Sequence, residues 1–171
     1  MQLTDPTPEA VVHFIARVVD APWPRESGAF MAYFDRLGCT PGESLEYTDP
    51  VPGSAGGPFS CESIFLENGS WAAFRGQLFS LNFFLYSGRR DSEALAEVGF
   101  EAVRERLSAE FGPPVDSGDD ANGNHSAFWT PGENSIELYG HVALAPAPQV
   151  GVGRRSVEAL YNEGALQADR R

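Results

Sequence analysis

The sequence contains no lysine, because all 12 of its basic residues are arginine. This absence excludes chemistry that needs a lysine amine, such as a P-loop, a Schiff base, a protein-kinase site or a Ser-x-x-Lys pair. A Gly-x-Gly-x-x-Gly fingerprint and a Gly-x-Ser-x-Gly elbow are also missing, so neither a dinucleotide fold nor an α/β-hydrolase is indicated. Because no motif specifies a reaction, we expect a protein that is not an enzyme.

Positive charge is scarce. The 171 residues include 24 acids against 12 bases, which gives a net charge of -12. Nucleic-acid binding needs clustered cations that neutralise phosphates, so we expect no nucleic-acid partner. A strongly negative surface instead accelerates encounter with cationic proteins, and we therefore expect a basic protein partner.

Cysteines and long apolar runs are few as well. Two isolated cysteines, Cys39 and Cys61, fit a reducing cytoplasm and the role of small buried side chains, although a bridge between them stays open. The longest apolar run, 78–86, is interrupted by Ser80 and Asn82 and is too short to span a bilayer. The N-terminus lacks signal-peptide features. We expect a cytoplasmic protein without membrane contact.

The first part of the chain predicts helices followed by a loop. Thr7 and Pro8 suit the start of a helix whose apolar stripe recurs at helical spacing until the prolines at 22 and 24. A second helix is expected over 27–37, with Gly38 as its left-handed C-terminal residue. The Gly- and Pro-rich residues 40–59 predict a long loop with at most a short strand at 44–48.

The next segment predicts a strand hairpin. Asn68-Gly69 is a strong two-residue turn signal, and this turn would place Leu66 opposite Trp71. A second turn at Gly76-Gln77 would lead into a strand over 78–86, one face of which is strongly apolar.

A long helix and a second hairpin follow. The helix is expected to begin after a cap at Asp91 or Ser92 and to end near Phe111. The hairpin joins strands 126–130 and 135–144. The prolines at 146 and 148 are expected to end its second strand, before a short helix at 156–161 and a frayed tail at 167–171.

These elements predict one α+β domain over residues 1–171. We expect an antiparallel sheet of about five strands packed against helices, in the order α-α-β-β-β-α-β-β-α. The apolar stripes of the strand at 78–86 and of the long helix should meet in the core. Its expected members are Leu81, Phe83, Phe100, Val103 and Leu107.

Metal and cofactor sites are not indicated. Residues 116–124 gather oxygen ligands of the kind that calcium prefers, but an EF-hand spacing would put Gly118 first and Trp129 twelfth, where acids belong. We therefore expect a solvated acidic loop and no cofactor.

In the second hairpin His125 pairs with Gly140, so His141 points to the other face. A one-residue slip would bring the two histidines together.

The order of elements and the acidity resemble those of small acidic secretion chaperones and chaperone-like adaptor domains, in which a bent antiparallel sheet carries helices on one face. The chain is also similar to the small immunity proteins of bacterial polymorphic toxin systems in its modest size, acidity, lack of a catalytic motif and aromatics among acids. This resemblance implies an immunity or antitoxin-type inhibitor that neutralises a cognate toxin. The alternatives are a secretion chaperone or adaptor, and a small hydrolase or ligand-binding protein.

The second hairpin is the expected binding surface. If Trp129 pairs with Ile136 in the core, the opposite face carries aromatic and acidic residues, and the acidic loop before the hairpin could supply a charged rim. The alternative is that a helix covers this face and the acids only aid solubility. The residues expected to contact the partner are Asp116, Asp119, Asp120, Phe128, Glu137 and Tyr139.

Overall fold

The computed structural model describes residues 3–45, 51–86, 92–142 and 146–168. They form an α+β protein with a single antiparallel sheet of eight strands. The α-helices are α1 (Pro8–Asp20), α2 (Phe30–Leu37), α3 (Ser92–Phe111) and α4 (Arg155–Ala168), with short 3₁₀ helices η1 (Ser27–Ala29) and η2 (Glu62–Ile64). The strands are β1 (Cys39–Pro41), β2 (Ser54–Cys61), β3 (Leu66–Phe74), β4 (Gln77–Phe84), β5 (Asp116–Asp119), β6 (His125–Trp129), β7 (Asn134–His141) and β8 (Ala147–Arg154).

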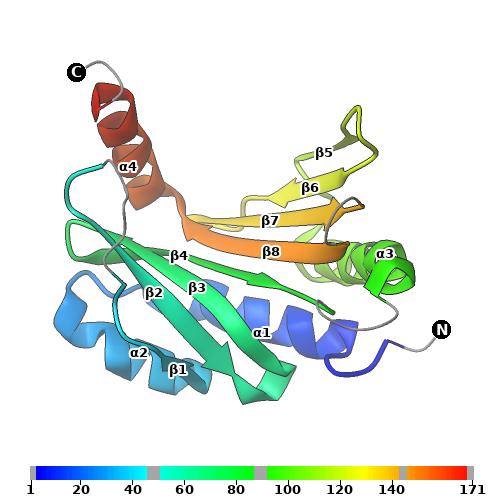
Figure 1. Cartoon of the computed structure of the whole chain (residues 1–171), viewed down its shortest axis with the longest axis horizontal. Helices are drawn as coiled ribbons and strands as arrows, with labels where there is room; N and C mark the ends of the chain where they lie inside the picture. Colours follow the sequence, from blue (N-terminus) through cyan, green and yellow to red (C-terminus); the bar gives the residue numbers. More distant parts are fainter. Residues whose placement is uncertain (1–2, 46–50, 87–91, 143–145, 169–171) are drawn as a thin grey trace.

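The sheet has the order β1-β2-β3-β4-β8-β7-β6-β5. The chain therefore builds two successive units, each a helical segment followed by four antiparallel strands, and β4 and β8 join them at the centre (Figure 1). The predicted α+β class with an antiparallel sheet is confirmed. The predicted number of about five strands and the predicted order are wrong.

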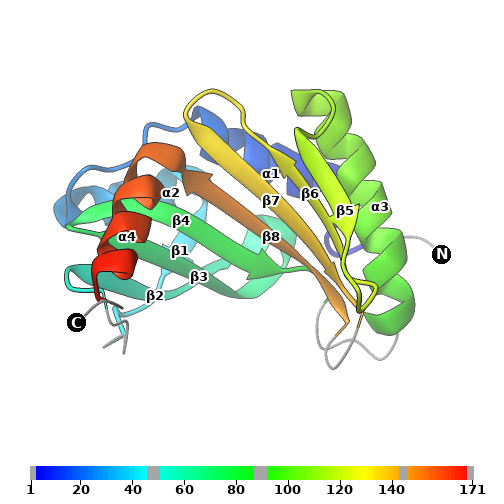
Figure 2. The ribbon, with the colours of Figure 1, turned by 90° about the horizontal axis from the view of Figure 1, so that it is seen from above.

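The main core lies between the sheet and the three N-terminal α-helices. α1 and α3 pack against each other, and α3 also packs on β7 and β8. α4 stands on the opposite face of the sheet, at one end of it (Figures 1 and 2). The predicted core residues are all at most 3% exposed, which confirms both apolar stripes. They are Leu81, Phe83, Phe100, Val103 and Leu107.

The predicted helix signals are confirmed by their local geometry. Thr7 caps α1 by accepting a hydrogen bond from the Ala10 amide at 3.2 Å, and Pro8 is the first helical residue. Gly38 ends α2 in the left-handed conformation with φ of 70°. The predicted cap at Asp91 lies outside the described residues.

None of the helices in the described ranges combines the length and apolar character that a bilayer crossing needs.

The predicted loop at 40–59 is wrong in part, because it contains β1 and β2. Glycine and proline argued against a strand, but the sheet accommodates them here. The Pro58 carbonyl accepts from the Gly42 amide at 2.8 Å, so its donorless nitrogen also points to this side, where β1 has already ended. Of the strand expected at 44–48, Leu45 forms one isolated bridge, to Gly56. Residues 46–50 lie outside the described ranges.

The predicted turn at Asn68-Gly69 is also wrong, because β3 continues straight through it. The chain reverses instead at η2 and at Arg75-Gly76, where both residues have positive φ, 50° and 77°. The second turn thus falls one residue before the predicted one. Gly69 is required for another reason: a Cβ there would lie 2.4 Å from the ring of Phe59, which packs over it.

The last part of the chain has more regular structure than predicted. The expected loop begins with strand β5, the strand expected over 135–144 is β7 and ends at His141, and β8 continues through Pro148. The last helix runs over 155–168 rather than 156–161. Residues 167 and 168 of the expected frayed tail are helical, and 169–171 lie outside the described residues.

Substituting alanine for Gly69 should destabilise the protein by about 1–3 kcal/mol, because the new methyl group overpacks against Phe59. Phe59 is only 1% exposed, so its ring has no free space to enter. Urea denaturation measures the effect. Gly28→Ala is the control, since a Cβ at Gly28 meets no atom within 4 Å. Equal stabilities of the two variants would show that Phe59 does not need the bare backbone.

Candidate functional site

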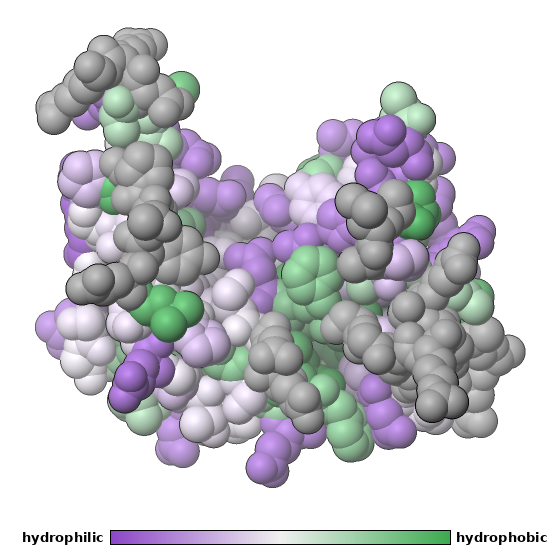
Figure 3. Space-filling view, in the orientation of Figure 1, coloured by the Kyte–Doolittle hydropathy of each residue, from purple (hydrophilic) through white to green (hydrophobic). Residues whose placement is uncertain are grey.

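Between α4 and the β5–β6 hairpin, no helix of the described residues covers this face of the sheet (Figure 2). The space-filling view shows a hollow there, with α4 as one wall and the hairpin as the other (Figure 3). We call this surface the open face. Its strand positions are Ser80, Asn82 and Phe84 of β4; Gln149, Gly151 and Gly153 of β8; Ser135, Glu137, Tyr139 and His141 of β7; Ser126 and Phe128 of β6; and Asp116 and Gly118 of β5.

The register places these residues side by side. One row across the strands runs Asn82, Gly151, Glu137, Phe128, Asp116, each directly opposite the next. Side chains alternate between the two faces of a strand, so this row shares one side of the sheet. Phe128 thus lies directly opposite Glu137, on the face that the predicted hairpin register assigns to aromatic and acidic residues.

The core side of the same hairpin also has the predicted register. Trp129 pairs with Ile136, and they are 1% and 0% exposed. The alternative that a helix covers the hairpin's other face is not what the described residues show, since α4 contacts β4 and β8 at the far end.

Aromatic rings form a ladder along the open face. The rings of Phe128 and Tyr139 meet edge to face with centroids 5.5 Å apart, and Tyr139 stacks on His141 at 6.3 Å. His141 in turn lies 6.0 Å from Phe84, which is 45% exposed. Accessible aromatics on a rigid sheet present a large contact area at low entropic cost, which suits the centre of an interface.

Two carboxylates lie beside this ladder. The Tyr139 hydroxyl donates to Glu137 Oε2 at 3.3 Å, and the Ser135 hydroxyl donates to Glu158 Oε2 at 3.3 Å. Burial raises the pKa of Glu137, and the negative charge of Glu158 raises it further, against the lowering effect of the Tyr139 hydrogen bond. Burial, followed by the charge of Glu137, raises the pKa of Tyr139 to about 12. The site thus concentrates negative charge in partly desolvated surroundings.

No basic side chain of the described residues pairs with these carboxylates. The ion pairs within the described ranges are Arg104–Glu101, Arg106–Glu9 and His125–Asp119, and none is on the open face. The strand positions of this face include no arginine. Within the described ranges, no ion pair therefore neutralises the negative charge of this face.

At the floor of the hollow, two glycines of β8, Gly151 and Gly153, are buried beneath polar side chains. A Cβ at Gly151 would lie 2.8 Å from Asn82 Oδ1 and 3.6 Å from Glu137 Oε2. A Cβ at Gly153 would lie 2.8 Å from the Ser135 hydroxyl oxygen. Polar side chains of β4 and β7 therefore lie over the two glycines, and no side chain of β8 fills the hollow at these two positions.

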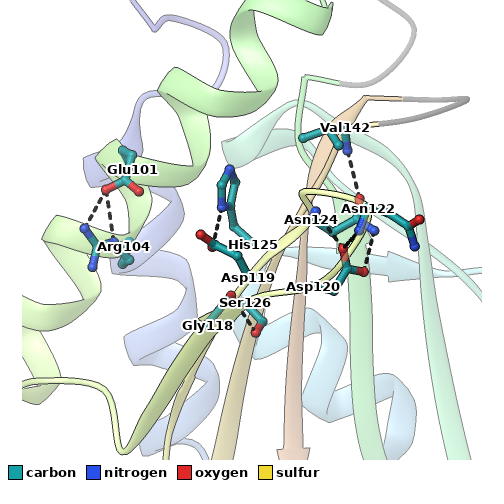
Figure 4. Close-up of polar contacts among 10 residues, drawn as sticks. All are labelled: Glu101, Arg104, Gly118, Asp119, Asp120, Asn122, Asn124, His125, Ser126 and Val142. Atoms are coloured by element: carbon teal, nitrogen blue, oxygen red, sulfur yellow. Dashed lines mark hydrogen bonds and ion pairs between the residues drawn. The ribbon is translucent and has the colours of Figure 1, made fainter.

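The three aspartates of the predicted rim are in three different environments, and Figure 4 shows two of them, Asp119 and Asp120. Asp116 is exposed on the open face, opposite Phe128. Asp119 points to the α3 side, where its Oδ1 lies 2.6 Å from His125 Nδ1. Of the three, the structure brings Asp116 alone to the face that carries Glu137 and Tyr139.

Asp120 holds the tip of the hairpin together. Its carboxylate accepts from the amides of Asn122 and Asn124 at 2.8 and 3.0 Å and from the Asn124 side chain at 2.8 Å. The hydrogen bond from the Asn124 side chain, followed by those from the backbone, lowers the pKa of Asp120. Its oxygens are thus committed to a local turn. Among the described residues, no group of three or more His, Cys, Asp or Glu side chains is placed to hold a metal ion.

The hairpin also offers a histidine–acid pair. A shallow pocket of about 340 Å³ lies between α3 and β5, with the His125–Asp119 pair and the ring of Phe100 in its lining. Ser126 is on the opposite face of β6, where its hydroxyl donates to the Gly118 carbonyl at 3.2 Å. The arrangement therefore does not align this serine with the imidazole as a nucleophile–base pair would require.

The two histidines do not converge. His125 pairs with Gly140 in the sheet, as predicted, and its ring lies against Phe100 of α3. His141 is on the open face, where its Nε2 lies 2.9 Å from Gln149 Oε1. The expectation that the register separates them is confirmed.

Compared with protein-family models, with curated proteins and with solved structures, the chain matches none. The proposals below therefore rest on the geometry of this chain.

Replacing Glu137 with glutamine should stabilise the protein at pH 7. Its raised pKa means that the folded state favours the protonated form, so its contribution to stability is present below the unfolded pKa and is lost as the pH rises through the folded pKa. Glutamine mimics the protonated form at every pH. The gain should therefore be largest near neutrality and disappear below the ordinary glutamate pKa of about 4.3.

Urea denaturation between pH 4 and pH 8 checks this effect. Glu105→Gln, on an exposed position of α3, is the control for removing one negative charge. A Glu137→Gln variant that is no more stable than the control at any pH would contradict the assignment of a raised pKa to Glu137.

Proposed function

We propose that this protein is a non-catalytic binding protein whose open face recognises a basic partner protein. We propose further that it acts in the cytoplasm as an immunity-type inhibitor of a cognate bacterial toxin. The observation that supports this most is the combination of an aromatic ladder with carboxylates that no described cation neutralises.

The two components have different physical roles. The carboxylates at Asp116, Glu137 and Glu158, with a net charge of -12, attract a cationic surface and accelerate its arrival. Charge alone gives a salt-sensitive contact of low specificity. The aromatic ladder supplies the desolvated centre that slows dissociation. An inhibitor needs both, because it must find its target quickly and remain bound.

A secretion chaperone or adaptor is the second candidate. The observation that favours it is the bent antiparallel sheet with α1, α2 and α3 on one face, which is the architecture that the resemblance to chaperone-like domains implies (Figure 1). Such a protein would bind an unfolded basic segment of an effector, whereas an inhibitor binds a folded toxin.

The protein encoded by the neighbouring gene is the partner to test, by measuring association and dissociation rates over a salt series. The double variant Asp116→Asn, Glu158→Gln should associate several-fold more slowly and with a flatter salt dependence. Its control is Glu105→Gln, Glu110→Gln, which removes the same charge from exposed positions of α3. Tyr139→Ala should instead mainly accelerate dissociation.

Three outcomes separate the possibilities. Tight binding to the folded neighbour, with relief of the growth arrest that it causes, supports the inhibitor. Binding that survives only with an unfolded segment of the neighbour favours the chaperone. Equal rates for the two double variants and for Tyr139→Ala would show that the open face is not the recognition surface.

A further inference from the structure

The two cysteines face each other across the edge of the sheet. Cys39 is the first residue of β1 and Cys61 is the last residue of β2, and the two are direct partners in the antiparallel register. Both are free thiols and are buried, with 6% and 1% exposure. The binding face proposed above does not involve them.

The hydrogen-bond pattern shows which kind of pair they form. The Gly42 amide donates to the Pro58 carbonyl at 2.8 Å, so these residues occupy a hydrogen-bonded position of the ladder. Such positions alternate with non-hydrogen-bonded ones, and Cys39–Cys61 lies three steps away, in a non-hydrogen-bonded position. In these pairs the Cα atoms are about 4.5 Å apart. Disulfides span Cα distances from about 4.4 Å upward, so the bond could form without displacing either strand.

The surroundings shift the pKa values of the two thiols in opposite directions. The adjacent Cys39 thiol, then the Ser63 hydroxyl at 3.2 Å and nearby amides, lower the pKa of Cys61 to about 6 against the opposing effect of burial. The same thiol–thiol contact, together with burial, raises the pKa of Cys39. These contacts, with the Ser63 hydroxyl beside Cys61 alone, favour Cys61 over Cys39 as the attacking thiol.

We propose that Cys39 and Cys61 form an oxidative modification site, which hydroperoxides convert into a disulfide between β1 and β2. The Cys61 thiolate attacks one peroxide oxygen and breaks the O–O bond, which gives a sulfenic acid and, after proton uptake, water. The Cys39 sulfur then attacks the Cys61 sulfur. The S–S bond forms, the S–O bond breaks, and a second water leaves with the Cys39 proton. Two thiols and one hydrogen peroxide thus yield one disulfide and two waters.

The position of the two cysteines at the edge of the sheet determines how peroxide reaches them and what the disulfide does to stability. β1 has three residues and is the edge strand of the described sheet, so local opening exposes the thiols to a molecule as small as hydrogen peroxide. The disulfide would tie the edge strand, and with it the end of α2, to β2. It would raise the melting temperature by roughly 5–10 °C, because it restricts the unfolded chain. β2 and β3 separate this edge from the open face, so partner binding should not change.

The test treats fully reduced full-length protein with stoichiometric hydrogen peroxide, followed by intact mass, non-reducing peptide mapping and thermal melting. We expect the loss of two hydrogens, one linked Cys39–Cys61 peptide pair, and a higher melting temperature that a reductant reverses. In Cys39→Ser, the Cys61 sulfenic acid should persist and be trapped by a dione reagent. In Cys61→Ser, Cys39 should react much more slowly.

Two results would overturn the proposal. The first is a wild-type protein that keeps two alkylatable thiols, or forms only intermolecular disulfides, after peroxide treatment. The second is equal peroxide reactivity of the two serine variants, which would contradict the assignment of Cys61 as the attacking thiol.

Discussion

Truncating Phe83 to alanine is expected to lower the free energy of unfolding by about 3–5 kcal/mol. Phe83 is 1% exposed at the centre of the sheet. Its ring meets Phe14 of α1 at 5.7 Å and Phe59 of β2 at 6.5 Å, both edge to face. The truncation therefore removes contacts to a helix and to a strand two places along the sheet at once, and leaves a cavity in the core.

The adjacent residue is the matched control. Phe84 is 45% exposed on the opposite face of the same strand, so Phe84→Ala should cost less than about 1 kcal/mol. Both variants are compared by urea denaturation, with the same dependence of the free energy of unfolding on urea concentration used for both. A loss below about 1 kcal/mol at Phe83 would mean that β4 presents its other face to the core.

Local signals were sufficient where an element is stabilised by its own sequence. The cap at Thr7 and the left-handed Gly38 lie where the pattern predicts, and α3 ends at Phe111 as expected. The β6–β7 register is also confirmed, since a one-residue slip would move Trp129 and Ile136 out of the core.

Tertiary packing overrode local signals elsewhere. Asn68-Gly69 is a turn signal, yet β3 continues through it. Glycine is needed at position 69 because the ring of Phe59 occupies the space that a Cβ would take. β2 and β8 contain prolines and glycines that argue against strands, and their neighbours in the sheet supply the pairing that propensity lacks. The similarity of the two four-stranded units is topological and leaves no periodic pattern in the sequence.

Only the part of the candidate site that depends on local sequence could be predicted. Phe128, Glu137 and Tyr139 follow from one hairpin register, which depends on neighbouring residues. The floor at Gly151 requires β8, and the second carboxylate, Glu158, requires α4 to be placed over the sheet. One signal was available: in 150–153 the order Val-Gly-Val-Gly alternates with period two, as in a strand with one bare face.

Replacing Gly151 with leucine should abolish most of the partner affinity without unfolding the protein. The new side chain rises from the floor of the open face, between Asn82 and Glu137. Its closest neighbours are the ends of these two side chains, which can move aside, and Gly151 has no positive φ that would strain a larger residue. The hollow is filled while the core beneath it is left unchanged.

The most direct measurement is the dissociation constant of the complex with the neighbouring gene's product, at one fixed salt concentration, for wild type, Gly151→Leu and Gly28→Leu. Gly28 is the control because it lies in η1 with open space around it. The open-face account predicts that Gly151→Leu binds at least about 30-fold more weakly, the loss of one interface hot spot, while Gly28→Leu stays within about threefold of wild type. A folded Gly151→Leu protein with wild-type affinity would contradict the account.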